Sequence, residues 1–343
     1  MIEFQPSADQ TQIVDSVAGY LQREFPLERL QPKAAARTVR AAWSELAEQG
    51  FFALAASEDI GGAGFTVVEE MLAHREFGRA LASPSVLATG LAIHLLEGAG
   101  LKELAAGLVR GEQHVAMGLA RGPLSLGPVV DGPLHLVDSE PADLILLQSA
   151  DGLALFERNN LVDVEPVASL DESVTLHRAR AVGVAASVSA ADSSLPQRSA
   201  LLLAASLVGM AEAARDQAVD HARIREQFGK HIGSFQGVAH HCADMEVRTR
   251  AARAQTSFAA IALHDARADA AFHVSAAAIV AADAGIRNAT MAIRVLGGLG
   301  FTAECALHLY LKRSHLYERM AGGSRALEAD ILRHRTEAIF AGV

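Results

Sequence analysis

The sequence predicts a mainly α-helical protein with a small β domain between two helical regions. Alanine and leucine dominate and aromatic residues make up only 5% of the chain, a composition that favours helix. Near residue 115 helical spacing gives way to short apolar runs separated by turn residues, and near residue 190 it returns. The domains predicted from these changes, in a chain of 343 residues, are 1–115, 116–190 and 191–343.

The first region reads as a series of helices. Ser7–Gln10 is a capping-box pattern, which would satisfy free amides at a helix start. Apolar residues then recur at helical spacing. The remaining expected features are an amphipathic helix from Trp43 to Gly50, a loop from Glu58 to Phe65, a helix from near Thr66, and helices containing Leu91–Leu96 and Leu101–Leu108.

The middle region reads as short strands. Val129–Pro133 is a turn signal between apolar runs. Leu144–Leu147 and Leu153–Phe156 flank Ala150-Asp151-Gly152, which predicts a hairpin. Val174 and Leu176 alternate with polar residues, as in a strand.

The third region reads as a helical bundle. Ala200–Ala211 is apolar on all sides, which is typical of a helix in the middle of a bundle. Long helical segments continue from there to about His334.

Composition limits the possible functions. A net charge of -10 argues against general nucleic-acid binding, which needs a basic face. Two cysteines, Cys242 and Cys305, make a disulfide framework unexpected and fit a reducing cytoplasm. The N-terminus shows no signal-peptide pattern, and the run Ala200–Ala211 is shorter than the roughly 18 residues that a membrane span requires. We therefore expect a cytoplasmic protein without a membrane segment.

Two motifs carry most of the chemical information. The first runs from Arg225 to Gln236 and begins Arg-Glu-Gln-Phe-Gly-Lys. A guanidinium can fork onto a pyrophosphate, although a lone arginine at a helix end is more often simply solvated. The second is Gly297-Gly298-Leu299-Gly300-Phe301. Its glycines would let the backbone approach a phosphate or ring, although the same pattern also suits a helix C-cap followed by a turn.

Several segments, in order along the chain, are similar to signatures of the acyl-CoA dehydrogenase family. The resemblance covers nearly the whole sequence and implies an N-terminal helical domain, a middle β domain and a C-terminal four-helix bundle. The segments are Trp43–Gly50, Glu58–Gly64, Glu76–Leu81, Arg225–Gln236 with Ala243–Met245, and Arg294–Thr302 with Glu304.

The resemblance implies FAD as cofactor and an acyl-CoA as substrate. The family arginine that matches Arg225 reaches the FAD of a neighbouring subunit. Arg294 stands where the family usually has a glutamine that contacts FAD. An arginine differs from it in length and charge, so this contact is expected to change. The other residues that the resemblance assigns to FAD are Gln227 and Phe228 near the ribose and adenine, Phe235 and Gln236 close by, and the main chain of Gly297 and Gly298.

The middle domain departs from the family. In the family, Thr-Glu-Pro, Gly-Ser-Asp and Trp-Ile-Thr segments line the flavin. The corresponding segments of this chain are Gly118–Leu126 and Leu134–Ser139. Most hydroxyls and the aromatic wall are lost, and Asp138 and Ser139 are the candidates to replace part of them.

The catalytic base is missing from both places where the family carries it. Removing an α-proton from an acyl thioester needs a carboxylate facing the flavin. The usual loop position is Ala321, and the alternative position on the earlier helix falls at Ser199, counted back from Gly209. Glu318 and Glu328 are expected to be solvated or paired surface residues, so no catalytic residue is assigned.

No metal or nucleophile site is predicted. His240-His241-Cys242 lacks a second cluster at ligand spacing, and no elbow motif supports a Ser-His-Asp triad. Three hypotheses stay open: a homomeric acyl-CoA dehydrogenase (dimer or tetramer), a short base-lacking subunit in a heterotetramer with a glutamate-bearing homologue, and a flavin-free scaffold. The resemblance implies an electron-transfer flavoprotein as acceptor for the first two, and a role in lipid or sterol catabolism.

Overall fold

A computed structural model describes residues 5–30, 39–149, 152–190 and 194–340 of the chain. The chain forms two compact units. The unit called the bundle comprises Met1–Ala35, Met71–Ala82 and Ala200–Val343, and the unit called the sheet unit comprises Ala36–Glu70 and Ser83–Ser199. The predicted fold class is confirmed, since helical segments precede and follow a seven-stranded sheet.

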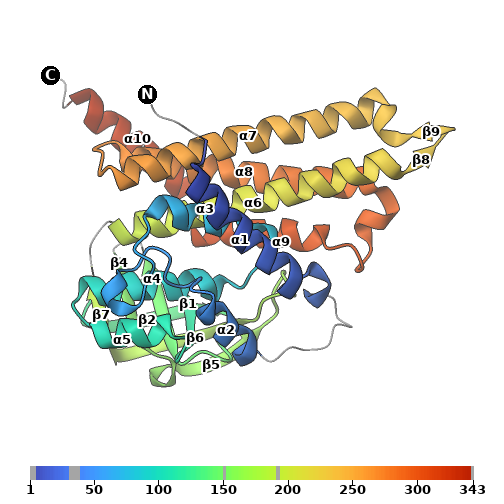
Figure 1. The fold of residues 1–343 in the computed structure, drawn as a ribbon. Coiled ribbons are helices and arrows are strands. Elements are labelled where there is room, and N and C mark those ends of the chain that lie inside the picture. The colour runs from blue at the N-terminus through green and yellow to red at the C-terminus, as the bar shows by residue number, and fades with distance from the viewer. Residues whose placement is uncertain (1–4, 31–38, 150–151, 191–193, 341–343) are drawn as a thin grey trace. The chain divides into compact units, whose positions relative to one another are not determined.

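The bundle is built on long helices that lie side by side (Figure 1). α7 and α8 pack along each other, and α9 and α10 pack against α8. The apolar segment Ala200–Ala211 lies within α6, and residues 201–211 are all buried, as expected for a central helix. The bounds are α1 Ala8–Glu24, η1 Leu27–Leu30, α3 Val67–Arg79, α6 Ser194–Ile224, α7 Gln236–His264, α8 Ala270–Leu296, α9 Leu307–Met320 and α10 Ser324–Phe340.

Two glycines let α3 and α6 cross with their backbones in contact. A Cβ atom on Gly209 would lie 1.9 Å from the Arg75 carbonyl oxygen, and one on Gly78 would lie 2.0 Å from that of Ser206. No side chain fits at either position without moving a backbone. The close crossing therefore depends on these two residues.

The first helix begins as predicted. The Ser7 hydroxyl accepts a hydrogen bond from the Gln10 amide at 3.2 Å, and the Gln10 side chain accepts one from the Ser7 amide at 3.0 Å. This is the capping box, which satisfies two amides that the helix leaves free. The predicted helix from near Thr66 is confirmed as α3.

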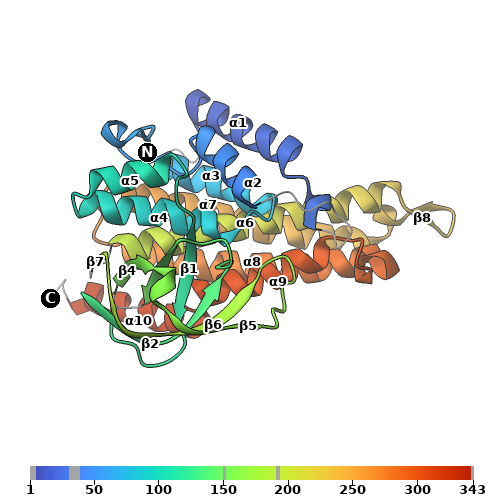
Figure 2. The ribbon, with the colours of Figure 1, turned by 90° about the horizontal axis from the view of Figure 1, so that it is seen from below.

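The sheet unit holds a seven-stranded mixed sheet in the order β5-β6-β2-β1-β3-β4-β7. β1 and β3 are parallel and the other neighbours are antiparallel. α4, an almost wholly buried helix, packs on β1 and on α5 (Figure 2). The bounds are α2 Val39–Glu48, η2 Glu58–Ile60, α4 Pro84–Gly98, α5 Lys102–Val109, β1 Val115–Ala120, β2 Val129–Val137, β3 Leu144–Ser149, β4 Gly152–Glu157, η3 Arg158–Asn160, β5 Val162–Val167, β6 Leu176–Ala185 and β7 Val188–Ala190.

The strand predictions were partly right. β3 and β4 form the expected antiparallel hairpin, although residues 150–151 of its turn lie outside the described residues. The turn expected at Val129–Pro133 was wrong, because this segment is the first half of β2. A register shift against β6 between Val130 and Gly132 accommodates the local irregularity, with Gly132 at φ 143°. The strand expected at Val174 begins at Leu176.

One described helical segment, Ala270–Phe301, is long and apolar enough to cross a membrane by length and composition. Half of its most apolar window is buried inside the protein. Core helices of soluble proteins pass the same test, so this feature is weak support for a membrane span.

Candidate cofactor site at one end of the bundle

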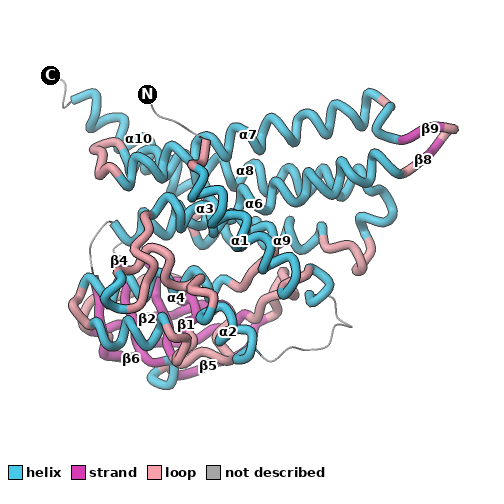
Figure 3. The backbone as a smooth tube through the Cα atoms, viewed as in Figure 1, coloured by secondary structure: helices cyan, strands magenta, loops and turns pink. Residues whose placement is uncertain are grey.

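The Arg225 motif forms a short hairpin that connects α6 to α7. β8 (Glu226–Gln227) pairs with β9 (Lys230–His231), and the 3-10 turn η4 (Ile232–Ser234) leads into α7. Phe228 and Gly229 make the turn with φ values of 53° and 78°, the positive values that a tight hairpin requires. Figure 3 shows the two strands projecting beyond the helices at one end of the bundle.

The side chains of this hairpin are directed to solvent. Arg225 is exposed and 92% of Phe228 is accessible. The Phe228 ring meets the Phe235 ring edge-on at 6.1 Å, and the Lys230 ammonium lies 4.3 Å from the centre of the Phe235 ring. Burial first, and the charge of Arg225 second, lower the pKa of His221 one turn earlier on α6. The hairpin therefore offers cations and aromatic faces to a ligand or to another chain.

The remaining two residues assigned from this motif are also on the surface. The Gln227 side chain donates a hydrogen bond to the Glu226 carbonyl at 2.8 Å, and Gln236 is the exposed first residue of α7. Lys230 was given no role from the sequence, although its place two residues after Phe228 in the motif could have suggested one. Its position over Phe235 depends on the hairpin turn.

The glycines of the second motif have three different roles. Gly297 ends α8 with a φ of 61°, a positive value that favours glycine. A Cβ on Gly298 would have no described atom within 4 Å, so its backbone is open to a ligand. A Cβ on Gly300 would lie 2.4 Å from the Ile293 carbonyl oxygen, so Gly300 serves packing within the chain. These residues form η5 (Gly297–Phe301), and Arg294 is exposed in the last turn of α8.

Both motifs lie at the same end of the bundle. α7 begins at the hairpin and packs along α8, which ends at η5, and Figures 1 and 2 agree on this placement. The end thus combines two exposed guanidinium groups, two aromatic rings and open glycine backbone. Guanidinium groups and free backbone amides suit phosphates, and aromatic faces suit planar rings.

The two expected base positions lack any proton acceptor of the required strength. Ala321 is the C-cap of α9, where it is followed by Gly322 and Gly323 at φ values of 106° and 81°. The neighbouring Glu318 accepts a hydrogen bond from the Ser324 hydroxyl and so helps to close this turn. In the sheet unit, Ser199 is fully buried and its hydroxyl donates to the Gln148 side chain at 2.7 Å.

Asp138 and Ser139 are engaged inside the sheet unit. The Asp138 carboxylate accepts hydrogen bonds from the Ser83 hydroxyl at 2.6 Å and the Thr175 amide at 2.8 Å. Ser139 lies 3.3 Å from His177, whose other ring nitrogen is 3.7 Å from Glu140. The arrangement of Ser139, His177 and Glu140 resembles a Ser-His-acid catalytic triad. Ser139 is wholly buried, however, so no substrate reaches its hydroxyl. These residues have structural roles in the described fold.

Metal chemistry gains no support from the described residues. In that part of the chain no three His, Cys, Asp or Glu side chains are grouped closely enough to hold an ion. His240 and His241 are exposed near the start of α7, and Cys242 is half-buried.

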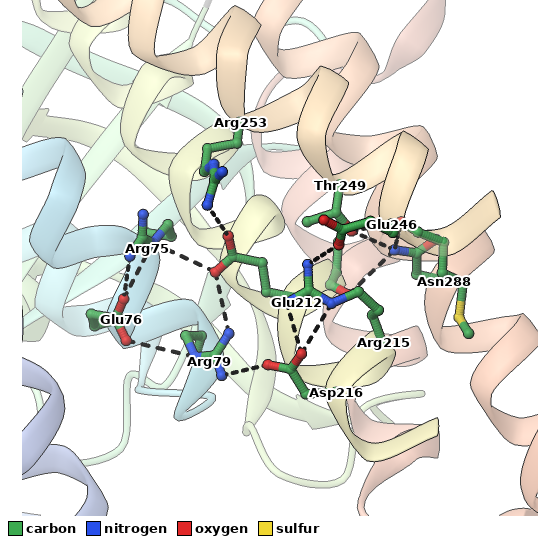
Figure 4. A network of polar contacts seen from close by, with 12 residues as sticks. Arg75, Glu76, Arg79, Glu212, Arg215, Asp216, Glu246, Thr249, Arg253 and Asn288 are labelled. Atoms are coloured by element: carbon green, nitrogen blue, oxygen red, sulfur yellow. Dashed lines mark hydrogen bonds and ion pairs between the residues drawn. The ribbon is translucent and has the colours of Figure 1, made fainter. Parts of the chain in front are cut away.

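A network of charged side chains lies within the bundle (Figure 4). The buried Glu212 carboxylate meets Arg79 at 3.2 Å, Arg75 at 3.5 Å and Arg253 at 3.8 Å. Burial disfavours ionisation of Asp216, but hydrogen bonds from Arg79 and Arg215 outweigh it and lower the pKa of that carboxyl. Sequence reasoning missed this network, although Arg75-Glu76 and Arg215-Asp216 are alternating charges on predicted helices.

A second polar cluster lies in the sheet unit. Glu70 is buried and accepts a hydrogen bond from Arg198 at 2.6 Å, and its other oxygen is 3.3 Å from His94. Burial opposes a charge on His94, but the carboxylates of Glu70 at 3.3 Å and Glu97 at 3.9 Å outweigh it and raise the pKa of the ring. The interaction with the His94 ring, whose Nδ1 lies 3.9 Å from the carboxylate, is the largest cause that lowers the pKa of Glu97 to about 2.

Comparison with known proteins identifies the family. Residues 7–110 match the model of the acyl-CoA dehydrogenase N-terminal domain, and residues 190–336 match that of the acyl-CoA dehydrogenase C-terminal domain. Neither match includes residues 111–189, which hold the sheet. This is the region in which the sequence departs from the family signatures.

Individual relatives agree with the family models. Acyl-CoA dehydrogenase IpdE2 of Mycobacterium tuberculosis is 32% identical over 84% of this chain and 86% of its own length. Acyl-CoA dehydrogenase FadE34 of the same organism is 35% identical over 83% of this chain, but this covers only 40% of that longer protein. One chain in the crystal structure of the ChsE4-ChsE5 complex, also from M. tuberculosis, superimposes with a TM-score of 0.85 at 25% identity, over 98% of this chain and 99% of its own length. The chain is therefore a member of the acyl-CoA dehydrogenase family.

Proposed function

We propose that this chain is the base-lacking subunit of a heteromeric, FAD-dependent acyl-CoA dehydrogenase. The observation that carries the proposal is Ala321 at the C-cap of α9, where the family resemblance requires a glutamate. Alanine cannot accept a proton, and the nearby Glu318 is bonded to Ser324. A partner subunit must then supply the carboxylate that removes the α-proton of an acyl-CoA thioester.

The residues at the end of the bundle fit an FAD. Arg225 would pair with the pyrophosphate, while Phe228 and Phe235 would offer ring faces to the adenine and Gln227 and Gln236 would offer polar contacts. The open backbone of Gly297 and Gly298 would admit the dinucleotide, and Arg294 would add a second positive charge. When bound, FAD supplies the hydride acceptor for oxidation of the Cα–Cβ bond.

The exposure of the hairpin supports a cofactor shared between subunits. Phe228 is 92% accessible although it is a large aromatic residue, and such residues are enriched in interfaces. The sequence departures in the middle domain also remove flavin-lining groups that another subunit could contribute.

Two relatives are consistent with two cooperating chains. One similar solved structure is a complex of ChsE4 with ChsE5. FadE34 is about twice as long as this chain, so it has room for a second segment of this size. For the present chain, a longer homologue with a glutamate at the position of Ala321 is the proposed partner, in a heterotetramer that passes electrons to an electron-transfer flavoprotein.

Co-expression tests the proposal directly. The chain is purified alone and together with a glutamate-bearing homologue from the same genome, and flavin absorbance, stoichiometry and dehydrogenation of acyl-CoA thioesters are measured. We expect a colourless, inactive chain alone and a yellow, active complex. One FAD per chain and turnover without a partner would show a homomeric enzyme, and no flavin under either condition would show a scaffold.

A further inference from the structure

A small cavity lies in the bundle where α3, α6 and α7 meet. It offers about 10 Å³ to a water-sized sphere. Apolar side chains of α3 and α6 form one side, and polar side chains reach it from α3 and α7. The lining residues are Met71, Leu72, Arg75, Ala205, Val208, Arg253, Thr256 and Ser257.

Thr256 is the unusual member of this lining. Only 2% of the residue is accessible, and its hydroxyl has no hydrogen-bond partner among the described residues. A buried hydroxyl without a partner is costly and rare in folded proteins. Its position in the lining of the cavity points to an occupant that can bond with it.

Thr249, two turns earlier on the same helix, provides a comparison. It is equally buried, but its hydroxyl donates to the Met245 carbonyl at 2.8 Å and accepts from the Asn288 amide at 2.8 Å. Both bonding capacities of Thr249 are therefore satisfied within the protein. The same residue type on the same helix lacks a described protein partner only where it borders the cavity.

Charge and size select the occupant. Arg75 lies 2.9 Å from Glu76 and 3.5 Å from Glu212, and Arg253 lies 3.8 Å from Glu212. The cations at the cavity are thus already matched by carboxylates, which disfavours an anion. A volume of about 10 Å³ corresponds to a single water molecule, which needs two to four polar partners. A guanidinium carries five N–H donors, more than these ion pairs use.

We propose that the cavity is a binding site for one structural water molecule, which bonds to the Thr256 hydroxyl and to a guanidinium lining the cavity. The water accepts from an arginine N–H and exchanges a hydrogen bond with Thr256 Oγ1. It thereby links the Thr256 hydroxyl to the arginines that pair with Glu212.

The sign of a stability change tests this site. Thr256→Val keeps the shape of the side chain and removes the hydroxyl. If water bonds to Thr256, the substitution removes one of its partners and lowers the Tm by about 2 °C. If the cavity is dry, the substitution removes an unsatisfied polar group and raises the Tm or leaves it unchanged.

A crystal structure of the full chain, in its complex if the partner is required, gives the second measurement. We expect a density peak within hydrogen-bond distance of Thr256 Oγ1 in the wild type and its loss in Thr256→Val. Thr249→Val is the calorimetric control and lowers the Tm whether or not the cavity holds water. Absence of the wild-type peak, or a Tm of Thr256→Val at or above that of the wild type, would overturn the proposal.

Discussion

The interior of the bundle and its hairpin end use the same residue types in opposite ways. In the interior, Arg75 and Arg79 are matched by the carboxylates of Glu76 and Glu212. At the hairpin end, Arg225 and Arg294 are exposed and Phe228 is almost completely accessible. The arginines of the first region stabilise the fold, and the arginines and Phe228 of the second region are available to bind something else.

Glycines show the same contrast. Gly78 and Gly209 permit direct backbone contact between α3 and α6, whereas Gly298 has open space where a side chain would stand. A glycine in the interior is therefore needed for packing, and one at the end is available for a ligand. Substitutions that separate stability from flavin binding test this division.

The largest effect is expected for Gly209→Ala. The new Cβ would lie 1.9 Å from the Arg75 carbonyl oxygen, so α3 and α6 must separate. We expect a loss of about 3 kcal/mol in the free energy of unfolding, or no folded protein, measured by denaturant titration. Gly98→Ala, in α4 with no described atom within 4 Å of its Cβ, is the control and should be neutral. Normal stability of Gly209→Ala would contradict the close crossing.

Glu212→Gln is expected to have the next largest effect. It keeps the size of the side chain but removes the carboxylate that faces Arg75, Arg79 and Arg253. Because these arginines are partly exposed, we expect a loss of about 2 kcal/mol rather than the full cost of a buried unpaired charge. Glu103→Gln, whose side chain is 92% exposed, should leave the denaturation midpoint unchanged. Equal midpoints for both variants would remove the structural role of Glu212.

Arg225→Ala should affect binding and leave stability unchanged. Loss of a charge-assisted bond to the pyrophosphate costs about 2 kcal/mol, which is about a 30-fold weaker affinity for FAD in the assembled complex. Flavin titration and the denaturation midpoint are measured on the same preparation. Arg223→Ala, also exposed near the end of α6, is the matched control. Unchanged flavin content in Arg225→Ala would refute the assignment of this arginine.

The smallest effect is expected from the His94 cluster, and it extends the comparison to the interior of the sheet unit. The groups around His94 are Glu70, Glu97 and Arg198, and their balance raises the pKa of the ring above 6.5. A raised folded-state pKa adds stability that is fully present below pH 6.5 and is lost as the pH rises through the folded value. The difference in unfolding free energy between wild type and His94→Gln should therefore shrink from pH 6 to pH 9. A constant difference would show that the charge on His94 contributes nothing.

Local sequence patterns predicted the elements whose signals are local. The capping box at Ser7, the apolar segment in α6 and the hairpin of β3 and β4 each depend on neighbouring residues. Val129–Pro133 misled because Gly132-Pro133 has the composition of a turn. Pairing with β6, about 50 residues later in the chain, makes it a strand with a register shift. No pattern within the segment carries that information.

The sequence alone determined the kinds of chemistry available to this protein. It contains Arg225 with two aromatic residues in one motif, a glycine-rich motif, and alanine at position 321. The tertiary structure decided which of these groups are open to a ligand. It exposes the hairpin, leaves space beside the backbone of Gly298 and packs Gly300 against Ile293. It also brings the Ser324 hydroxyl into a hydrogen bond with Glu318. The physical reason is that residue types fix charge, size and proton affinity, whereas accessibility and pairing depend on contacts between residues far apart in the chain.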